Sequence, residues 1–166
     1  MTIHDLSRVE NETITSFVQS CSEHLSGRVL DFGCGKQPYR PIVESAGGEY
    51  HGFDRVTFGG NVSGRNLGSI EGDYDAVLCT QVLAYVHEVG ECLFDLKDSL
   101  REGGRLILTY PAAWPVIRDE LWHFTKLGME ALLEQAGFTV ERHDLRHGID
   151  FDGFSVPMGY GALARA

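Results

Sequence analysis

The sequence has few cysteines, few basic residues and no long apolar run, and each shortage excludes a class of protein. The four cysteines, at positions 21, 34, 79 and 92, form no C-x-x-C pair and have no histidine at metal-ligand spacing, so we expect reduced thiols. Lys and Arg number 14 against 24 Asp and Glu, a net charge of −10, which disfavours binding to nucleic-acid phosphates. No apolar run approaches the roughly 20 residues of a membrane span. Residues 1–10 show no secretory signal pattern, so we expect a cytoplasmic protein.

His143 and His147 lie four residues apart with Asp144 between them. A metal ion would need helical geometry to bring both imidazoles together, and this segment has the pattern of a strand and a turn. We therefore predict no metal site.

The chain does contain alternating strand-like and helix-like segments, in 166 residues that suit one domain. Buried-looking strands alternating with amphipathic helices predict a mostly parallel, doubly wound α/β sheet with helices on both faces. The expected helices lie near residues 7–25, 38–46, 88–100 and 126–136, the last with Thr125 as its N-cap. The expected strands lie near residues 28–32, 49–53, 61–63, 75–79, 105–110, 138–145 and 158–164. A linker at 147–157 without a helical pattern favours an antiparallel pair of final strands.

A glycine turn follows the first predicted strand, at the sheet edge where such folds bind ligands. Gly33 and Gly35 leave main-chain N–H groups open to a ligand, but Pro38 stands where the dinucleotide fingerprint needs its third glycine, which disfavours a nicotinamide cofactor. Asp54, 21 residues after Gly33, can accept hydrogen bonds from ribose hydroxyls. Asp31 would repel a phosphate and pair with an ammonium group. S-adenosylmethionine, an amino acid joined to a nucleoside without phosphate, has the composition that fits both carboxylates.

Four segments, in this order, resemble the motifs of class I S-adenosylmethionine-dependent methyltransferases. They are VLDFGCG at 29–35, GFD at 52–54, YDAVLCTQVL at 74–83 and LREGGRLIL at 100–108. Segments 33–41, 111–115, 121–125 and 136–138 resemble the small methyltransferase-11-like proteins within that superfamily. The resemblance implies a Rossmann-like, seven-stranded sheet in the order 3-2-1-4-5-7-6 with the last strand antiparallel. It also implies one domain, with a leading helix in 1–26, a cofactor-binding core in 28–137 and a terminal antiparallel strand pair in 138–166.

The resemblance also implies which residues hold the cofactor. The positions that hold the methionine end of the cofactor are matched by Asp31, Gly33 and Gly35, and the ribose position is matched by Asp54. The adenine position is matched by Asn66 and Leu67. The positions beside the methionyl part are matched by Thr80 and Gln81. The full implied set is Asp31, Gly33, Cys34, Gly35, Asp54, Arg55, Asn66, Leu67, Thr80 and Gln81. Two positions depart from the family pattern: Gln37 replaces the third glycine of the turn, and Tyr85 stands where related proteins have a histidine facing the reacting methyl group.

Methyl transfer depends mostly on proximity and alignment, and a general base helps a hydroxyl acceptor without being obligatory. The candidate catalytic residues are His87, His123 and Tyr85; imidazoles titrate near neutral pH, although either histidine would serve equally well as a surface or packing residue. Four aromatic residues could line an acceptor pocket or form a core patch, and both readings stay open. They are Tyr110, Trp114, Trp122 and Phe124.

The sequence therefore predicts an S-adenosylmethionine-dependent methyltransferase acting on a hydroxyl or amine of a small molecule or glycan. The acidic charge and the small size disfavour a polymeric acceptor and make nucleic acid an unlikely partner. Small relatives often complete the acceptor site with the N-terminal helix or a second subunit, which leaves a homodimer open. The alternatives are an RNA or protein methyltransferase, or a non-catalytic S-adenosylmethionine-binding module.

Overall fold

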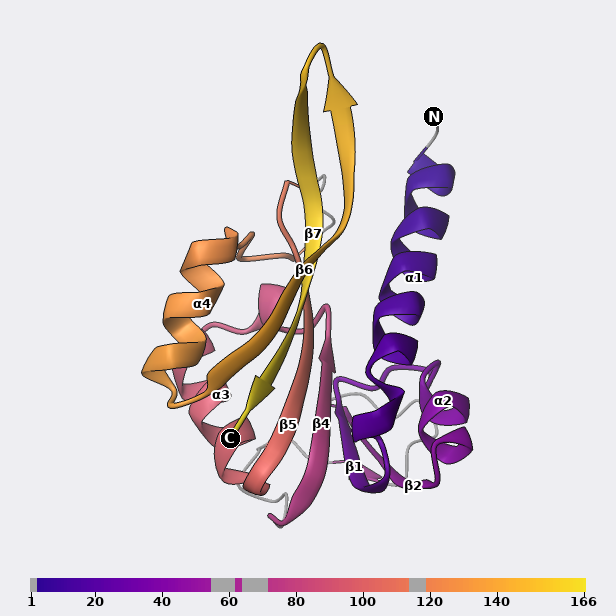
Figure 1. Ribbon diagram of the computed structural model, residues 1–166, viewed down its shortest axis with the longest axis vertical. Coiled ribbons are helices and arrows are strands. Elements are labelled where there is room, and N and C mark those ends of the chain that lie inside the picture. Colours follow the sequence, from indigo (N-terminus) through magenta and orange to yellow (C-terminus); the bar gives the residue numbers. More distant parts are fainter. Residues whose placement is uncertain (1–2, 55–61, 64–71, 114–118) are drawn as a thin grey trace.

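The computed structural model describes residues 3–54, 62–63, 72–113 and 119–166 (Figure 1). Its helices are α1 (Ile3–Ser20), α2 (Arg40–Ser45), α3 (Val89–Asp98) and α4 (Lys126–Gln135), with 3-10 turns η1 (Ser22–His24) and η3 (Leu83–Tyr85). Its strands are β1 (Gly27–Phe32), β2 (Gly48–Asp54), β3 (Val62–Ser63), β4 (Tyr74–Thr80), β5 (Leu100–Pro111), β6 (Thr139–Phe151) and β7 (Phe154–Arg165).

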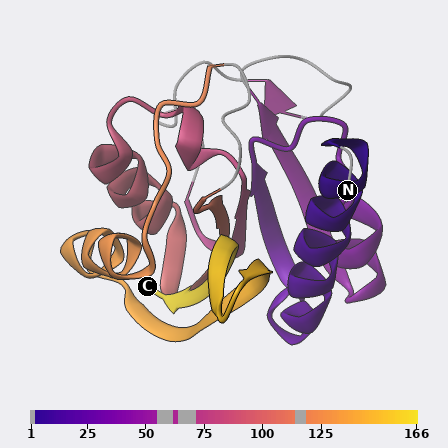
Figure 2. The ribbon, with the colours of Figure 1, turned by 90° about the horizontal axis from the view of Figure 1, so that it is seen from above.

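All seven strands belong to one sheet, in the order β3-β2-β1-β4-β5-β7-β6. The pairs among strands β1 to β5 are all parallel, and β7 lies antiparallel between β5 and β6. This confirms the predicted fold class and strand order. The parallel strands all finish at one edge of the sheet, the carboxyl edge, which Figure 2 shows from above.

Helices cover both faces of the sheet (Figures 1 and 2). Helices α1 and α2 cover one face, where Phe17, Val18 and Val43 pack on strand residues such as Leu78. Helices α3 and α4 cover the other face over a larger core that includes Leu93 and Leu133. The strands between these layers carry near-continuous apolar residues because both of their faces are buried.

Helices α2, α3 and α4 begin and end close to the predicted residues, whereas the first helix, predicted near 7–25, begins and ends earlier in the chain, as α1 followed by η1. Thr125 is the N-cap of α4, as predicted, and its hydroxyl accepts from the Gly128 N–H at 3.0 Å. All four cysteines are free and buried. Within the described part of the chain, no helix has the length and apolarity needed to cross a bilayer.

The prediction of a linker at 147–157 is wrong. Strands β6 and β7 run through it as one long antiparallel hairpin whose last pair is Phe151↔Phe154. Asp152 and Gly153, with φ of 31° and 94°, form the two-residue turn. Asp-Gly with positive φ at both positions is a strong hairpin signal because its twist matches that of the strands.

Strand β5 also begins earlier than predicted. Its first paired residue is Leu100, opposite Tyr74, and regular pairing resumes at Arg105 opposite Ala76. Gly103, with φ of 75°, lies in the irregular stretch between these pairs. Gly103 therefore lies in a distorted start of the strand.

Candidate functional site

The glycine turn after β1 lies at the carboxyl edge. Gly33 has φ of 76°, and a Cβ there would lie 2.2 Å from Val82 Cγ2, so only glycine fits between this turn and the segment after β4. Gly35 has φ of 50°, and a Cβ there would meet no atom within 4 Å. Gln37, in place of the third glycine, keeps a left-handed backbone with φ of 60°. Gln37 thus adopts the backbone region that favours glycine, at the position where the family pattern has a glycine.

Asp31 is fully buried near the end of β1. Its Oδ2 accepts a hydrogen bond from the Tyr50 hydroxyl at 2.5 Å, whereas its Oδ1 has no hydrogen-bond donor among the described residues. Burial raises the pKa of the Asp31 carboxyl to about 7, although the Tyr50 hydrogen bond acts in the opposite direction. A buried carboxylate with one free oxygen is suited to a cationic partner.

Asp54 ends β2 and faces the glycine turn. Its Oδ2 accepts from the Gly35 N–H at 2.9 Å, and the N–H groups of Gly33 and Cys34 both donate to the Phe53 carbonyl. These bonds hold the turn after β1 against the end of β2. The expectation that the N–H groups of Gly33 and Gly35 are open to a ligand is therefore wrong, because both donate within the protein. Burial raises the pKa of the Cys34 thiol to about 11, so this side chain stays a neutral thiol.

The end of β4 supplies the third part of this edge. Gln81 has φ of 58°, and its side-chain amide donates to Thr109 Oγ1 at 3.3 Å. A non-glycine residue in this backbone region is uncommon and tends to occur at functional sites. Thr80 forms a side-chain hydrogen bond with Tyr39 from the turn before α2. The structure therefore brings together the predicted residues of strands β1, β2 and β4.

Two of the three predicted catalytic residues share one carboxylate. The Tyr85 hydroxyl lies 3.4 Å from Glu120 Oε1, and His123 Nε2 lies 3.3 Å from Glu120 Oε2. The Glu120 side chain is only 7% exposed. Backbone bonds from Leu121 to the Ala84 carbonyl hold this segment against η3. His87 is exposed beyond η3 and is not part of this group.

The predicted aromatic residues divide between core and surface. Tyr110 and Phe124 are buried core residues whose rings meet edge to face with centroids 5.8 Å apart. Trp122 is 45% exposed, and its indole N–H donates to the Val86 carbonyl. The core reading thus holds for Tyr110 and Phe124. Four predicted residues lie outside the described part of the chain: Arg55, Asn66, Leu67 and Trp114.

The two histidines considered as metal ligands bind different partners. His143 Nδ1 lies 2.8 Å from Glu130 of α4, whereas His147 Nε2 lies 3.4 Å from Glu10 of α1. Arg146 is the extra residue between the pairs Leu145↔Tyr160 and His147↔Gly159, a bulge that breaks the strand alternation between them. No group of three or more His, Cys, Asp or Glu side chains suited to a metal occurs among the residues described.

Four polar residues at this edge were not predicted from the sequence: Glu10, Tyr39, Glu120 and Arg146. Tyr39 joins the cofactor-side residues through Thr80, and Glu120 joins Tyr85 to His123. Glu10 and Arg146 form a salt bridge between α1 and β6 at 2.6 Å. Only the position of Tyr39 beside the glycine turn was a usable signal, because the other contacts are set by tertiary packing.

A family model described as a methyltransferase domain matches residues 6–143. The chain belongs to this methyltransferase family. A comparison with curated protein sequences found no match.

Solved methyltransferase structures share the fold. An S-adenosylmethionine-dependent methyltransferase from Archaeoglobus fulgidus is 14% identical, with a TM-score of 0.75, over 95% of this chain and 94% of that one. Magnesium protoporphyrin IX methyltransferase from Synechocystis PCC 6803, with bound S-adenosylmethionine, is 20% identical, with a TM-score of 0.69, over 98% and 82%. A methyltransferase in complex with the activator Trm112, from Haloferax volcanii, is 13% identical, with a TM-score of 0.69, over 95% and 93%.

These comparisons confirm the predicted class of methyltransferase at the level of family and fold. The finer resemblance to methyltransferase-11-like proteins stays a prediction. The roles of the individual site residues also stay predictions, because sequence identities of 13–20% show a shared fold but do not show which residues bind the cofactor.

Proposed function

We propose that this methyltransferase moves a methyl group from S-adenosylmethionine to a hydroxyl or amine of a small molecule or glycan. The observation that carries the proposal is the free Oδ1 of the buried Asp31 beside the glycine turn. An ammonium group would satisfy that oxygen and offset the penalty of its burial. A phosphate would be repelled there.

The described residues fit this cofactor. Asp31 binds the ammonium group, the turn from Gly33 to Gly35 lies along the methionine end, and Asp54 accepts from the ribose hydroxyls. Thr80 and Gln81 line the end of β4 beside the methionyl part, and Cys34 lies within the turn as a neutral thiol. Arg55, Asn66 and Leu67 keep their proposed roles beside the ribose and adenine. When bound, the cofactor supplies an electrophilic methyl group on a sulfonium.

The acceptor is proposed to enter over the end of β4. Tyr85 and His123, held together by Glu120, are the polar side chains that would orient it there. Trp122 and Leu121, both nearly half exposed beside this group, offer apolar surface for a sugar or a planar ring. His87 is exposed and would meet only an acceptor that extends beyond η3. The net charge of −10 favours a neutral or cationic acceptor over a nucleic acid.

The first test is calorimetric titration with S-adenosylmethionine, S-adenosylhomocysteine and NADH. We expect saturable binding of the first two and none of NADH. Asp31→Asn and Asp54→Asn should each weaken binding by at least about 1–3 kcal/mol, the value of a hydrogen bond to a charged group. Asp98→Asn, an exposed change at the end of α3, is the control and should bind as the wild type does. Unchanged affinity in both site variants would refute the assignment.

A further inference from the structure

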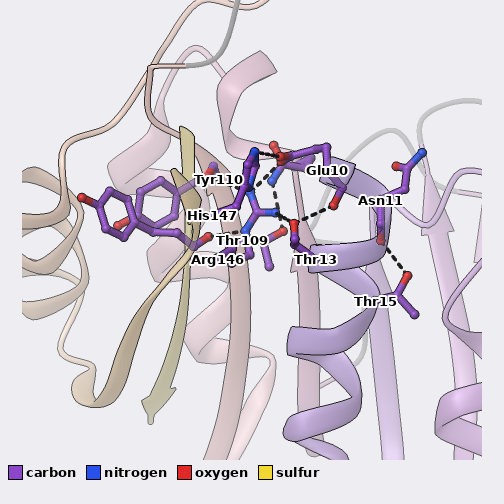
Figure 3. Close-up of polar contacts among 10 residues, drawn as sticks. Glu10, Asn11, Thr13, Thr15, Thr109, Tyr110, Arg146 and His147 are labelled. Carbon is purple, nitrogen blue, oxygen red and sulfur yellow. Dashed lines mark hydrogen bonds and ion pairs between the residues drawn. The ribbon is translucent and has the colours of Figure 1, made fainter. Parts of the chain in front are cut away.

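Two groups of polar side chains lie at the carboxyl edge of the sheet. The first joins α1 to β6 and has Arg146 at its centre (Figure 3). The second joins η3 to the segment that follows β5 and has Glu120 at its centre. Only a group with an atom accessible to a ligand can take part in methyl transfer, and the two groups differ in this respect.

The Arg146 group is engaged within the protein. Arg146 donates to Glu10 and Thr13 of α1 and to two backbone carbonyls, and its side chain is 1% exposed. Both ring nitrogens of His147 are buried, and Nε2 lies 3.4 Å from Glu10 Oε2. This group therefore serves to fasten α1 to the β6–β7 hairpin.

Turn η3, which carries the other group, starts in contact with the glycine turn. A Cβ at Gly33 would lie 2.2 Å from Val82 Cγ2, so the Val82 side chain lies against that turn. Val82 is the N-cap of η3, and the Tyr85 N–H donates to its carbonyl at 2.9 Å. Side chains three residues apart eclipse one another along a 3-10 helix. Tyr85 therefore projects from the side of η3 that faces the glycine turn.

Glu120 holds His123 beside Tyr85 at this position. The Tyr85 hydroxyl lies 3.4 Å from Glu120 Oε1, and His123 Nε2 lies 3.3 Å from Glu120 Oε2. The Leu121 N–H donates to the Ala84 carbonyl at 2.7 Å and so fixes the segment of Glu120 and His123 against η3. Because η3 follows β4 and this segment follows β5, the Glu120 group lies over the ends of these two strands.

Glu120 determines which nitrogen of His123 can accept a proton. A carboxylate oxygen only accepts hydrogen bonds, so the neutral imidazole carries its hydrogen on Nε2, the nitrogen that faces Glu120. Nδ1 is then the basic nitrogen, and it has no hydrogen-bond partner among the residues that the structure describes. The His123 side chain is 25% exposed, against 7% for Glu120. The imidazole is therefore accessible to a ligand, while the carboxylate that orients it is shielded.

We infer that His123 Nδ1, oriented by Glu120, takes the proton of a hydroxyl acceptor during methyl transfer. The inference rests on the proposed function and narrows its substrate class to alcohols and phenols. A hydroxyl oxygen becomes a good nucleophile as it loses its proton, whereas a neutral amine attacks with its free lone pair. The acceptor oxygen bonds the methyl carbon as the carbon–sulfur bond breaks with its electron pair on sulfur, and the hydroxyl proton passes to His123 Nδ1. Glu120 is a positioning residue that stabilises the resulting imidazolium.

The decisive measurement is NMR of the histidine ring nitrogens, assigned with His123→Gln, and it needs no known acceptor. The free protein should show the Nε2–H tautomer of His123, and Glu120→Gln should show a mixture of tautomers. In saturated complexes, the midpoint of the His123 titration should be lower with S-adenosylmethionine than with S-adenosylhomocysteine by at least about 0.3 pH unit, because the sulfonium charge disfavours a nearby imidazolium. An Nδ1–H tautomer or equal midpoints would overturn the inference and leave the proposed function intact. If neither compound binds in calorimetry, the proposed function itself fails.

Methyl transfer to a panel of alcohols, phenols and matched amines gives the second readout. His123→Gln should lower kcat for hydroxyl acceptors by roughly 10²–10⁴-fold with little change in KM, and should remove the rise of kcat/KM between about pH 5 and 8. Glu120→Gln should lower kcat less. His24→Gln in η1, where the side chain is also 25% exposed, and Glu134→Gln on the exposed face of α4 are the matched controls and should behave as wild type. A wild-type pH profile in His123→Gln, or methylation of amines alone, would contradict the inference.

Discussion

At the scale of single residues, Asp31 is the side chain whose charge we propose to matter most for cofactor binding. Because burial raises its pKa to about 7, the carboxyl is largely protonated below that pH and cannot pair with an ammonium group. We expect the affinity for S-adenosylhomocysteine to rise between pH 6 and pH 8, with proton release on binding. Calorimetry in buffers of different ionisation enthalpy measures both quantities.

Asp31→Asn is the control for this pH dependence. The amide can still accept from Tyr50 but does not ionise, so its weaker binding should be flat over the same range. The raised pKa also means that the free protein loses stability as pH rises from about 4 to 7, because the folded state holds the proton more tightly than the unfolded chain. A wild-type affinity independent of pH would contradict this account of Asp31.

At the scale of elements, the β6–β7 hairpin depends on its two-residue turn. Gly153 has φ of 94°, a backbone conformation that a side chain strains. Gly153→Ala should lower the free energy of unfolding by about 1–2 kcal/mol, measured by urea denaturation. Asp152→Asn is the matched control, since Asn-Gly favours the same turn. Equal stability of the two variants would show that the turn does not determine hairpin stability.

The hairpin also shows where local sequence patterns fall short. Segment 147–157 contains Gly148, Asp152, Gly153 and Pro157, a composition typical of a loop, yet it forms two paired strands. The Asp-Gly signal was present, but the residues around it lack clean alternation because bulges at Arg146 and Met158 shift the pairing. By contrast, the helices near 88–100 and 126–136 were predicted well, since 3.6-residue periodicity and Thr125 marked them.

At the scale of the whole molecule, the Glu10–Arg146 salt bridge ties the first helix to the last hairpin across 136 positions. Arg146→Met would leave the Glu10 carboxylate buried without its cation, so we expect a loss of about 3–5 kcal/mol in the free energy of unfolding. The double variant with Glu10→Gln should recover part of that loss. Chemical denaturation of both variants measures the coupling, and additive losses would show that the two side chains do not interact.

The sequence by itself determined the class of fold and, through the family resemblance, the strand order; it also predicted which edge of the sheet holds the cofactor. Gly33, Asp31 and Asp54 could be predicted as cofactor residues because they lie at short spacings near the ends of two consecutive strands. Only the tertiary structure decided that Tyr85 and His123 meet on Glu120, that Tyr110 and Phe124 are core residues, and that Glu10 lies against Arg146 and His147. The physical reason is distance along the chain: periodicity and spacing report local geometry, whereas contacts between the first helix and the last hairpin arise from packing on a common sheet.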